Sequence, residues 1–132
     1  TDYFLYKFNI SKKDQKRIKF IDNFFKDKAD SKSFTEKNLN KVFYYNGKQA
    51  VLDILNYKII KSKKLDKNLI DLGKLYKNKE IPIMPIGAKI LMNKYQIKEG
   101  KQLGSKLKMI EKEWVENNFK ISNYQVDKII NN

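Results

Sequence analysis

Apolar residues recur every three or four positions through almost the whole chain, and this spacing constrains its fold more than any other feature. Leu39, Val42 and Phe43 are typical, because residues three and four apart share one face of an α-helix. No segment shows a convincing alternation of apolar and polar residues, which would indicate a half-buried strand. The sequence therefore predicts an all-α fold.

Two prolines, Pro82 and Pro85, interrupt the helical spacing in the segment EIPIMPIG. Proline lacks a backbone N–H and disfavours helix in the residue before it, so we expect an extended boundary here. We predict a helical body over residues 1–80 and a helical tail over residues 81–132. Together they are expected to form a compact helical bundle of about seven helices in two packed groups.

Each predicted helix has an apolar stripe that is expected to face the core. The stripes are Ile18, Ile21 and Phe25; Leu39, Val42 and Phe43; Val51, Leu55 and Ile59; Leu65, Leu69, Leu72 and Tyr76; Ile90 and Leu91; Leu103, Leu107, Ile110 and Trp114; and Val126, Ile129 and Ile130. Ser11 with Asp14, and Ser122 with Gln125, have the spacing of a capping box at a helix start. Ser33 or Thr35 is expected to cap a further helix.

The formal net charge is +14, and 28 of the 29 basic residues are lysine, with Arg17 the exception. A positive field of this size attracts polyanions, so nucleic acid is the first expected partner and an anionic membrane surface the second. The alternative is that part of the lysine excess reflects the codon bias of an AT-rich gene. The aromatic fraction of 13% and the hydrophobic fraction of 41% indicate a chain that folds in spite of its charge.

The chain contains no cysteine and no histidine. Disulfides and thiolate metal sites are therefore excluded, and so are the commonest general base and the commonest metal ligand. Asp53, Asp66 and Asp71 lie in lysine-rich helices, where solvated ion pairs are expected, so we predict no catalytic residue and no metal site. No apolar run approaches the roughly 20 residues that span a bilayer. The start, TDYFLYKFNI, has neither a methionine nor a signal peptide pattern, and we interpret the chain as a fragment of a longer cytoplasmic protein.

The segment from Lys98 to Lys108 is the strongest candidate for binding phosphate. Glycine at a helix start allows an anion to approach bare backbone N–H groups, and the helix dipole favours it there. The candidate residues for this contact with a nucleic acid are Lys98, Gly100, Lys101, Gly104 and Lys108. The alternative is structural: Gly100 as a permissive cap and Gly104 at a close helix crossing.

Two kinds of aromatic residue need a separate interpretation. Trp114 is in register with the apolar stripe, so we expect it in the core. Tyr44 and Tyr45 have the chemistry to stack on bases, although core or rim packing is the simpler expectation.

One resemblance covers most of the chain, and residues 82–119 carry its specific part. Its skeleton is Pro85, Gly87, Leu91, Met92, Tyr95, Ile97, Gly100, Leu103, Gly104, Leu107, Glu111 and Trp114. This pattern resembles the C-terminal signature of bacterial tRNA nucleotidyltransferases and poly(A) polymerases, the class II CCA-adding family. The segments FNISKKDQKRIKFI and NKVFYYNGKQAVLDIL are similar to earlier parts of the same family's body.

The resemblance implies a function that the residues alone do not. In that family the body and tail hold tRNA while a catalytic head adds nucleotides, using Mg²⁺ and nucleoside triphosphates. The head's arrangement of a Gly-Ser turn followed by an Asp-x-Asp pair does not occur here, because Gly104-Ser105 is followed by no such pair. Catalysis is therefore expected to belong to a parent enzyme. The expected function is binding of tRNA or another structured RNA, with CCA and poly(A) addition both open and no cofactor in this fragment.

Two other classes of function stay open. One is a helical protein-interaction module, in which the lysine excess reflects codon bias. The other is a basic domain that binds a membrane surface, which would require an amphipathic helix with an exposed apolar face. Every apolar stripe in the sequence can be used in the core, so we expect no membrane partner. The oligomeric state is also open.

Overall fold

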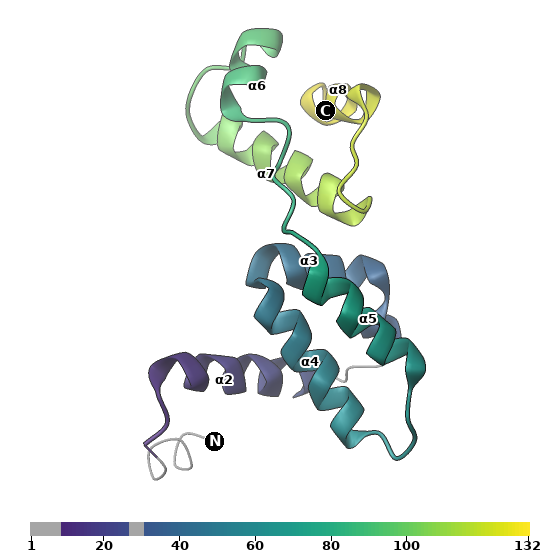
Figure 1. Cartoon of the computed structure of the whole chain (residues 1–132). Coiled ribbons are helices and arrows are strands. Elements are labelled where there is room, and N and C mark those ends of the chain that lie inside the picture. Colours follow the sequence, from purple (N-terminus) through teal and green to yellow (C-terminus); the bar gives the residue numbers. More distant parts are fainter. Residues whose placement is uncertain (1–8, 27–30) are drawn as a thin grey trace. The chain divides into compact units, whose positions relative to one another are not determined.

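The computed structural model in Figure 1 describes residues 9–26 and 31–132. Residues 1–8, which include most of the start on which the fragment interpretation depends, lie outside the described residues. Within these ranges the chain forms seven α-helices, one 3-10 helix and no strand. The predicted all-α fold is confirmed. The chain divides into two compact units, Thr1–Ile81 and Pro82–Asn132, which we describe separately.

The first unit is built around one central helix. Its elements are α2 (Lys12–Lys26), a 3-10 helix (Ser31–Phe34), α3 (Glu36–Asn46), α4 (Lys48–Lys61) and α5 (Lys67–Asn78). Helix α4 packs against α2, α3 and α5. Its buried residues include Val51, Ile54 and Leu55, which meet a core that also contains Leu39 and Phe43. The central helix is therefore the scaffold on which the other helices of this unit lie.

The starts and ends of these helices follow from local chemistry. The Asp14 N–H donates to Ser11 Oγ at 3.2 Å, which is one of the two bonds of the predicted capping box. The Asn38 N–H donates to Thr35 Oγ1 at 3.4 Å, so Thr35 is the cap of α3. Helix α3 ends before Gly47, whose φ of 93° lies in the region that favours glycine. Gly47 thus turns the chain directly from α3 into α4.

The prediction that Leu65 belongs to the apolar stripe of α5 is wrong. Asp66 is the N-cap, because its Oδ1 accepts the N–H groups of Asn68 at 3.0 Å and Leu69 at 3.4 Å. The helix begins directly after this cap, at Lys67, and leaves Leu65 outside it with 83% of its surface exposed. Leu69 and Tyr76 are buried as predicted.

The second unit consists of α6 (Ala88–Tyr95), α7 (Lys101–Glu116) and α8 (Asn123–Ile130). Its core is formed by Leu91, Leu103, Ile110 and Val126. Ser122 and Gln125 form the predicted capping box at the start of α8. Helix α7 packs against both α6 and α8, so its apolar face is covered along much of its length.

Trp114 and Ile90 of this unit were both predicted to be buried, and the structure confirms only the first. Trp114 is 2% exposed and packs edge to face against Phe119, so its expected place in the core is confirmed. Ile90 was expected to point inward with Leu91, but 46% of its surface is exposed. Adjacent helical residues differ in direction by about 100°, and Leu91 takes the inward position. None of the helices in the described residues has the length and apolarity required to cross a bilayer.

Candidate nucleic-acid interface

The N-terminus of α7 is formed by a glycine whose conformation other residues rarely adopt. Gly100 is the N-cap, with a φ of 142°, and because it has no side chain it makes no side-chain cap to the N–H groups of the first turn. The Gly104 N–H donates to the Gly100 carbonyl oxygen at 3.1 Å, which closes the first turn. The expected role of Gly100 as a permissive cap is therefore confirmed. The first-turn N–H groups and the helix dipole give this end a partial positive charge.

Lysines occupy the face of α7 that points away from the core. Lys101, Lys108 and Lys112 are exposed, whereas Leu103 and Ile110 are buried on the other side. Spacings of seven and four positions bring these lysines onto one stripe. The stripe begins at the same end of the helix as the Gly100 cap.

All five predicted site residues are exposed in one stretch of the chain. Lys98 and Gly100 lie in the loop before α7, and Lys101, Gly104 and Lys108 lie in the first eight residues of the helix. Within the part of the chain that the structure describes, the ammonium groups of Lys98, Lys101 and Lys108 have no hydrogen-bond or ion-pair partner. These ammonium groups are therefore available to an anionic ligand.

Gly104 does not lie at a close helix crossing. A Cβ atom added at this position would meet no heavy atom within 4 Å other than those of its chain neighbours and its own helix backbone, so the packing explanation is wrong. An exposed glycine inside a helix costs about 1 kcal/mol relative to alanine. The position is also next to the lysine stripe, one turn from both Lys101 and Lys108.

One lysine of α7 has a structural role that sequence reasoning missed. The Lys106 Nζ donates to the carbonyl oxygens of Ile129 at 3.0 Å and Asn132 at 2.8 Å. Ile129 lies in the last turn of α8, where carbonyl groups lack helical partners, and Asn132 lies two residues after the helix ends. Lys106 therefore caps α8, and no signal in the sequence distinguishes it from the exposed lysines around it.

A second tertiary contact joins α6 to α8. The Tyr95 hydroxyl hydrogen-bonds to the Asp127 carboxylate, and this bond is the main reason that the pKa of Tyr95 is raised. Tyr95 belongs to the family-like skeleton, and here its role is to join two helices of the second unit.

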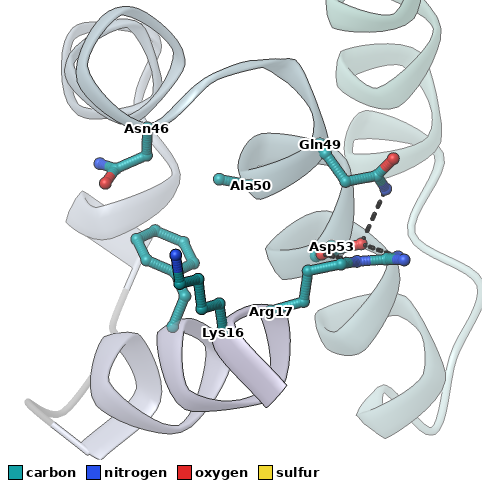
Figure 2. A pocket seen from close by; sticks show the side chains of 7 residues that line it. Lys16, Arg17, Asn46, Gln49, Ala50 and Asp53 are labelled. Atoms are coloured by element: carbon teal, nitrogen blue, oxygen red, sulfur yellow. Dashed lines mark hydrogen bonds and ion pairs between the residues drawn. The ribbon is translucent and has the colours of Figure 1, made fainter. Parts of the chain in front are cut away.

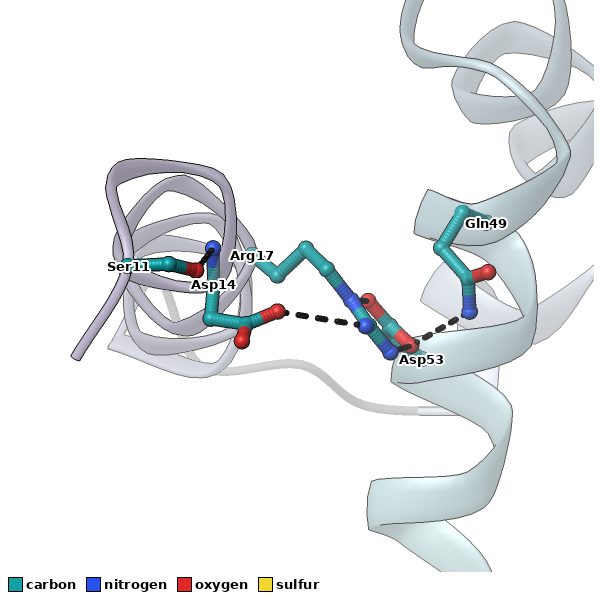
Figure 3. A network of polar contacts seen from close by, with 5 residues as sticks. All are labelled: Ser11, Asp14, Arg17, Gln49 and Asp53. Atoms are coloured by element: carbon teal, nitrogen blue, oxygen red, sulfur yellow. Dashed lines mark hydrogen bonds and ion pairs between the residues drawn. The ribbon is translucent and has the colours of Figure 1, made fainter.

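The first unit contains a polar network between α2 and α4 (Figure 3). Arg17 donates two hydrogen bonds to Asp53, and Gln49 Nε2 donates a third at 2.9 Å. The expected ion pair of Asp53 forms, with Arg17. Asp53 is only 7% exposed, however, so the expectation that this pair is solvated is wrong. Burial alone would raise the pKa of Asp53, but the hydrogen bonds from Arg17 and Gln49 outweigh it, and the pKa is lowered.

A pocket of about 330 Å³ opens beside this network (Figure 2). Its lining residues are Lys16, Arg17, Phe20, Asn46, Gln49, Ala50 and Asp53. The Asp53 carboxylate accepts three hydrogen bonds from two side chains, so it lacks the free, neutral-pH basicity of a general base. Among the described residues, no group of three or more acidic side chains is placed to hold a metal ion.

A buried hydrogen bond joins α3 to α5. The Tyr76 hydroxyl donates to Asn40 Oδ1 at 2.8 Å, and Lys79 Nζ donates to the same oxygen at 3.3 Å. Burial raises the pKa of Tyr76 to about 12. The Lys79 ammonium lies 5.3 Å from the centre of the Tyr76 ring, within range of a cation–π contact.

The tyrosines considered for base stacking lie at the end of α3. The rings of Tyr44 and Tyr45 are 5.0 Å apart and nearly perpendicular, and 54% of the Tyr45 surface is exposed. They form an edge-to-face pair at the rim of the first unit.

No protein-family model matches this chain, and comparison with curated proteins and with solved structures finds no match either.

Proposed function

We propose that this chain binds structured RNA, with tRNA as the expected ligand, as the body and tail of a cytoplasmic bacterial enzyme of the class II CCA-adding or poly(A)-adding family. In this proposal the chain positions the RNA, and a catalytic head outside this sequence adds nucleotides to the RNA 3′ end with Mg²⁺ and nucleoside triphosphates. The observation that carries the proposal is the grouping of Lys98, Lys101 and Lys108 beside the glycine-capped start of α7.

The chemistry of this surface favours phosphate over base edges. Lysine is a point charge without the planar fork that reads guanine, and backbone N–H groups at a helix start donate hydrogen bonds to a phosphate whatever base is attached to it. Such contacts fix the position of an RNA and carry little sequence information. A surface of this kind therefore suits a protein that recognises the shape of an RNA.

Charge is distributed over both units, which supports an extended contact with a polyanion. Residues 1–81 contain 20 basic and 10 acidic side chains, a net charge of +10, and residues 82–132 contain nine basic and five acidic ones, a net charge of +4. We expect the charge of the first unit to attract RNA over a distance. The lysines at the start of α7 are then expected to make the direct contacts with phosphate.

The test is fluorescence anisotropy with a labelled tRNA transcript, with duplex DNA and single-stranded RNA as controls. Each ligand is titrated at low and at near-physiological salt, because any protein this basic binds polyanions at low salt by counterion release. We expect tRNA to be preferred at the higher salt. Equal binding to all three ligands that disappears with salt would mean that the charge is generic.

The contribution of α7 is tested with two charge-matched double variants. Lys101→Glu with Lys108→Glu changes the proposed surface, and Lys120→Glu with Lys128→Glu changes two exposed lysines elsewhere in the same unit. We expect the first pair to weaken tRNA binding roughly tenfold more than the second. It should also reduce the slope of log K against log salt by about two, since each lost phosphate contact contributes about one.

A further inference from the structure

The turn between α4 and α5 exposes two aliphatic side chains among lysines. Ile60 is 80% exposed and Leu65 is 83% exposed, and both lie at the same end of the α4–α5 pair (Figure 1). We name the segment from Ile60 to Lys67 the α4–α5 tip. Its exposed lysines are Lys61, Lys63, Lys64 and Lys67, and its single acidic residue is Asp66.

The tip is held in place by its own hydrogen bonds. The Ser62 N–H donates to the Lys58 carbonyl oxygen at 3.0 Å, and Ser62 Oγ donates to the Lys64 carbonyl oxygen at 2.7 Å. Asp66 Oδ1 accepts the first N–H groups of α5. The acidic residue is therefore engaged as a helix cap, and the turn presents Leu65 to solvent in a defined conformation.

We propose that the α4–α5 tip docks onto the surface of a bilayer that contains anionic lipid. Transfer of the exposed Ile60 and Leu65 side chains from water to the boundary between headgroups and acyl chains lowers the free energy. Contact with the phosphates of a nucleic acid would not bury these apolar side chains. Lysines next to them are attracted by the negative surface potential of anionic lipids. An anionic bilayer is the partner that satisfies both groups of side chains together.

This inference is independent of RNA binding by α7, because it uses other residues in the other unit. It also revises an expectation from the sequence. A membrane partner was not expected, because every apolar stripe could be assigned to the core. The N-cap at Asp66 removes Leu65 from that stripe and places it in the turn.

The test is sedimentation of the 132-residue chain with vesicles of phosphatidylcholine that contain phosphatidylglycerol, at near-physiological salt, and with vesicles of phosphatidylcholine alone. We expect binding to the anionic vesicles. Ile60→Ser with Leu65→Ser should weaken it at least tenfold, and Lys63→Glu with Lys64→Glu should weaken it at least twentyfold, about fivefold for each lysine. Ile83→Ser is the matched control, because Ile83 is 90% exposed in the extended segment after α5 and should have no effect.

Insertion of the tip is measured separately by fluorescence. Trp114 is 2% exposed, so a tryptophan placed by Leu65→Trp supplies the emission that responds to vesicles. We expect a blue shift with anionic vesicles and none in buffer. Circular dichroism and urea denaturation establish that each variant is folded.

Three results would overturn the proposal. The first is that the wild-type chain does not sediment with anionic vesicles. The second is that the lysine variant loses vesicle binding, while binding by the serine variant and the Leu65→Trp emission are unchanged. Vesicle binding would then depend on positive charge alone and not on insertion of the tip. The third is that the serine variant weakens tRNA binding and leaves vesicle binding intact, which would make the tip an RNA contact.

Discussion

Arg17 and Asp53 meet at two points, with Nε 2.9 Å from Oδ2 and Nη2 2.8 Å from Oδ1. The two residues are 36 positions apart, in α2 and α4. Arg17 is the one arginine in a chain with 28 lysines, and a planar guanidinium is the side chain that can make this paired contact. The ion pair therefore explains why arginine is found at this position.

The first prediction is that Arg17→Lys destabilises the first unit although it keeps the charge. An ammonium group cannot donate two parallel hydrogen bonds to Asp53, which would then be left partly unsatisfied in a nearly buried position. We expect a lower midpoint in urea denaturation followed by circular dichroism. Lys13→Arg in the same helix is the control, and an equal effect of both changes would contradict this explanation.

The second prediction concerns the dependence of stability on acid. Because the pKa of Asp53 is lowered in the folded protein, its carboxylate stabilises the fold at pH values above the ordinary aspartate pKa of about 3.9. This contribution is lost as the pH falls through the lowered pKa. Asp53→Asn should therefore be less stable than wild type at pH 7, and the difference in free energy of unfolding should shrink below a pH of about 4.

The control for this experiment is Asp71→Asn, at an exposed position of α5. Its free energy of unfolding at pH 7 should stay within about 0.5 kcal/mol of wild type. If Asp53→Asn and wild type differ by the same amount from pH 7 to pH 3, Asp53 is not a source of acid lability.

The third prediction is an alkaline effect from Tyr76. Burial raises the pKa of Tyr76 to about 12, so the neutral phenol stabilises the fold below the ordinary pKa of about 10, and this contribution is lost as the pH rises through about 12. Tyr76→Phe removes the hydrogen bond to Asn40 and should cost about 1–2 kcal/mol at pH 7. The difference from wild type in urea denaturation should shrink between about pH 10 and 12.

Tyr124→Phe is the matched control for Tyr76, because 75% of the Tyr124 surface is exposed. It should leave the free energy of unfolding at pH 7 nearly unchanged. A cost at Tyr124 equal to that at Tyr76 would show that loss of a phenol, and not of the buried hydrogen bond, is responsible.

The fourth prediction separates the two glycines of α7. Gly100→Ala places a side chain at a φ of 142° and should destabilise the second unit by about 1–2 kcal/mol. Gly104→Ala adds a methyl group to open space on a regular helix and should stabilise the protein by up to about 1 kcal/mol. Thermal unfolding followed by circular dichroism measures both.

Gly104→Ala also tests the proposed RNA contact. If a phosphate approaches the backbone at Gly104, the added methyl group should weaken tRNA binding in the variant that is more stable. Stabilisation with unchanged tRNA binding would remove Gly104 from the proposed site and leave the lysines as its members.

The helices could be predicted from the sequence because their signals are local. Helix α4 follows directly from its apolar spacing, and Thr35, Gly47 and Ser122 mark helix ends through hydrogen bonds or backbone angles within a few residues. The prediction for Leu65 was wrong because the helix cap lies one residue after it. The prediction for Ile90 was wrong because only one of two adjacent apolar residues can point inward. Asp66 decides the first case and Leu91 the second.

Helical spacing was enough to predict the all-α fold, and the composition alone gives the large positive charge. Pro82 and Pro85 predict an extended segment, and residues 79–87 contain no helix. Tertiary structure decided which of many similar polar residues have a single role. Lys106 caps α8, Arg17 holds Asp53, and Asn40 accepts from Tyr76, with partners 23 to 36 positions away. The physical reason is that hydrogen-bond partners and burial depend on helices packing together, whereas helix period and caps depend on neighbours along the chain.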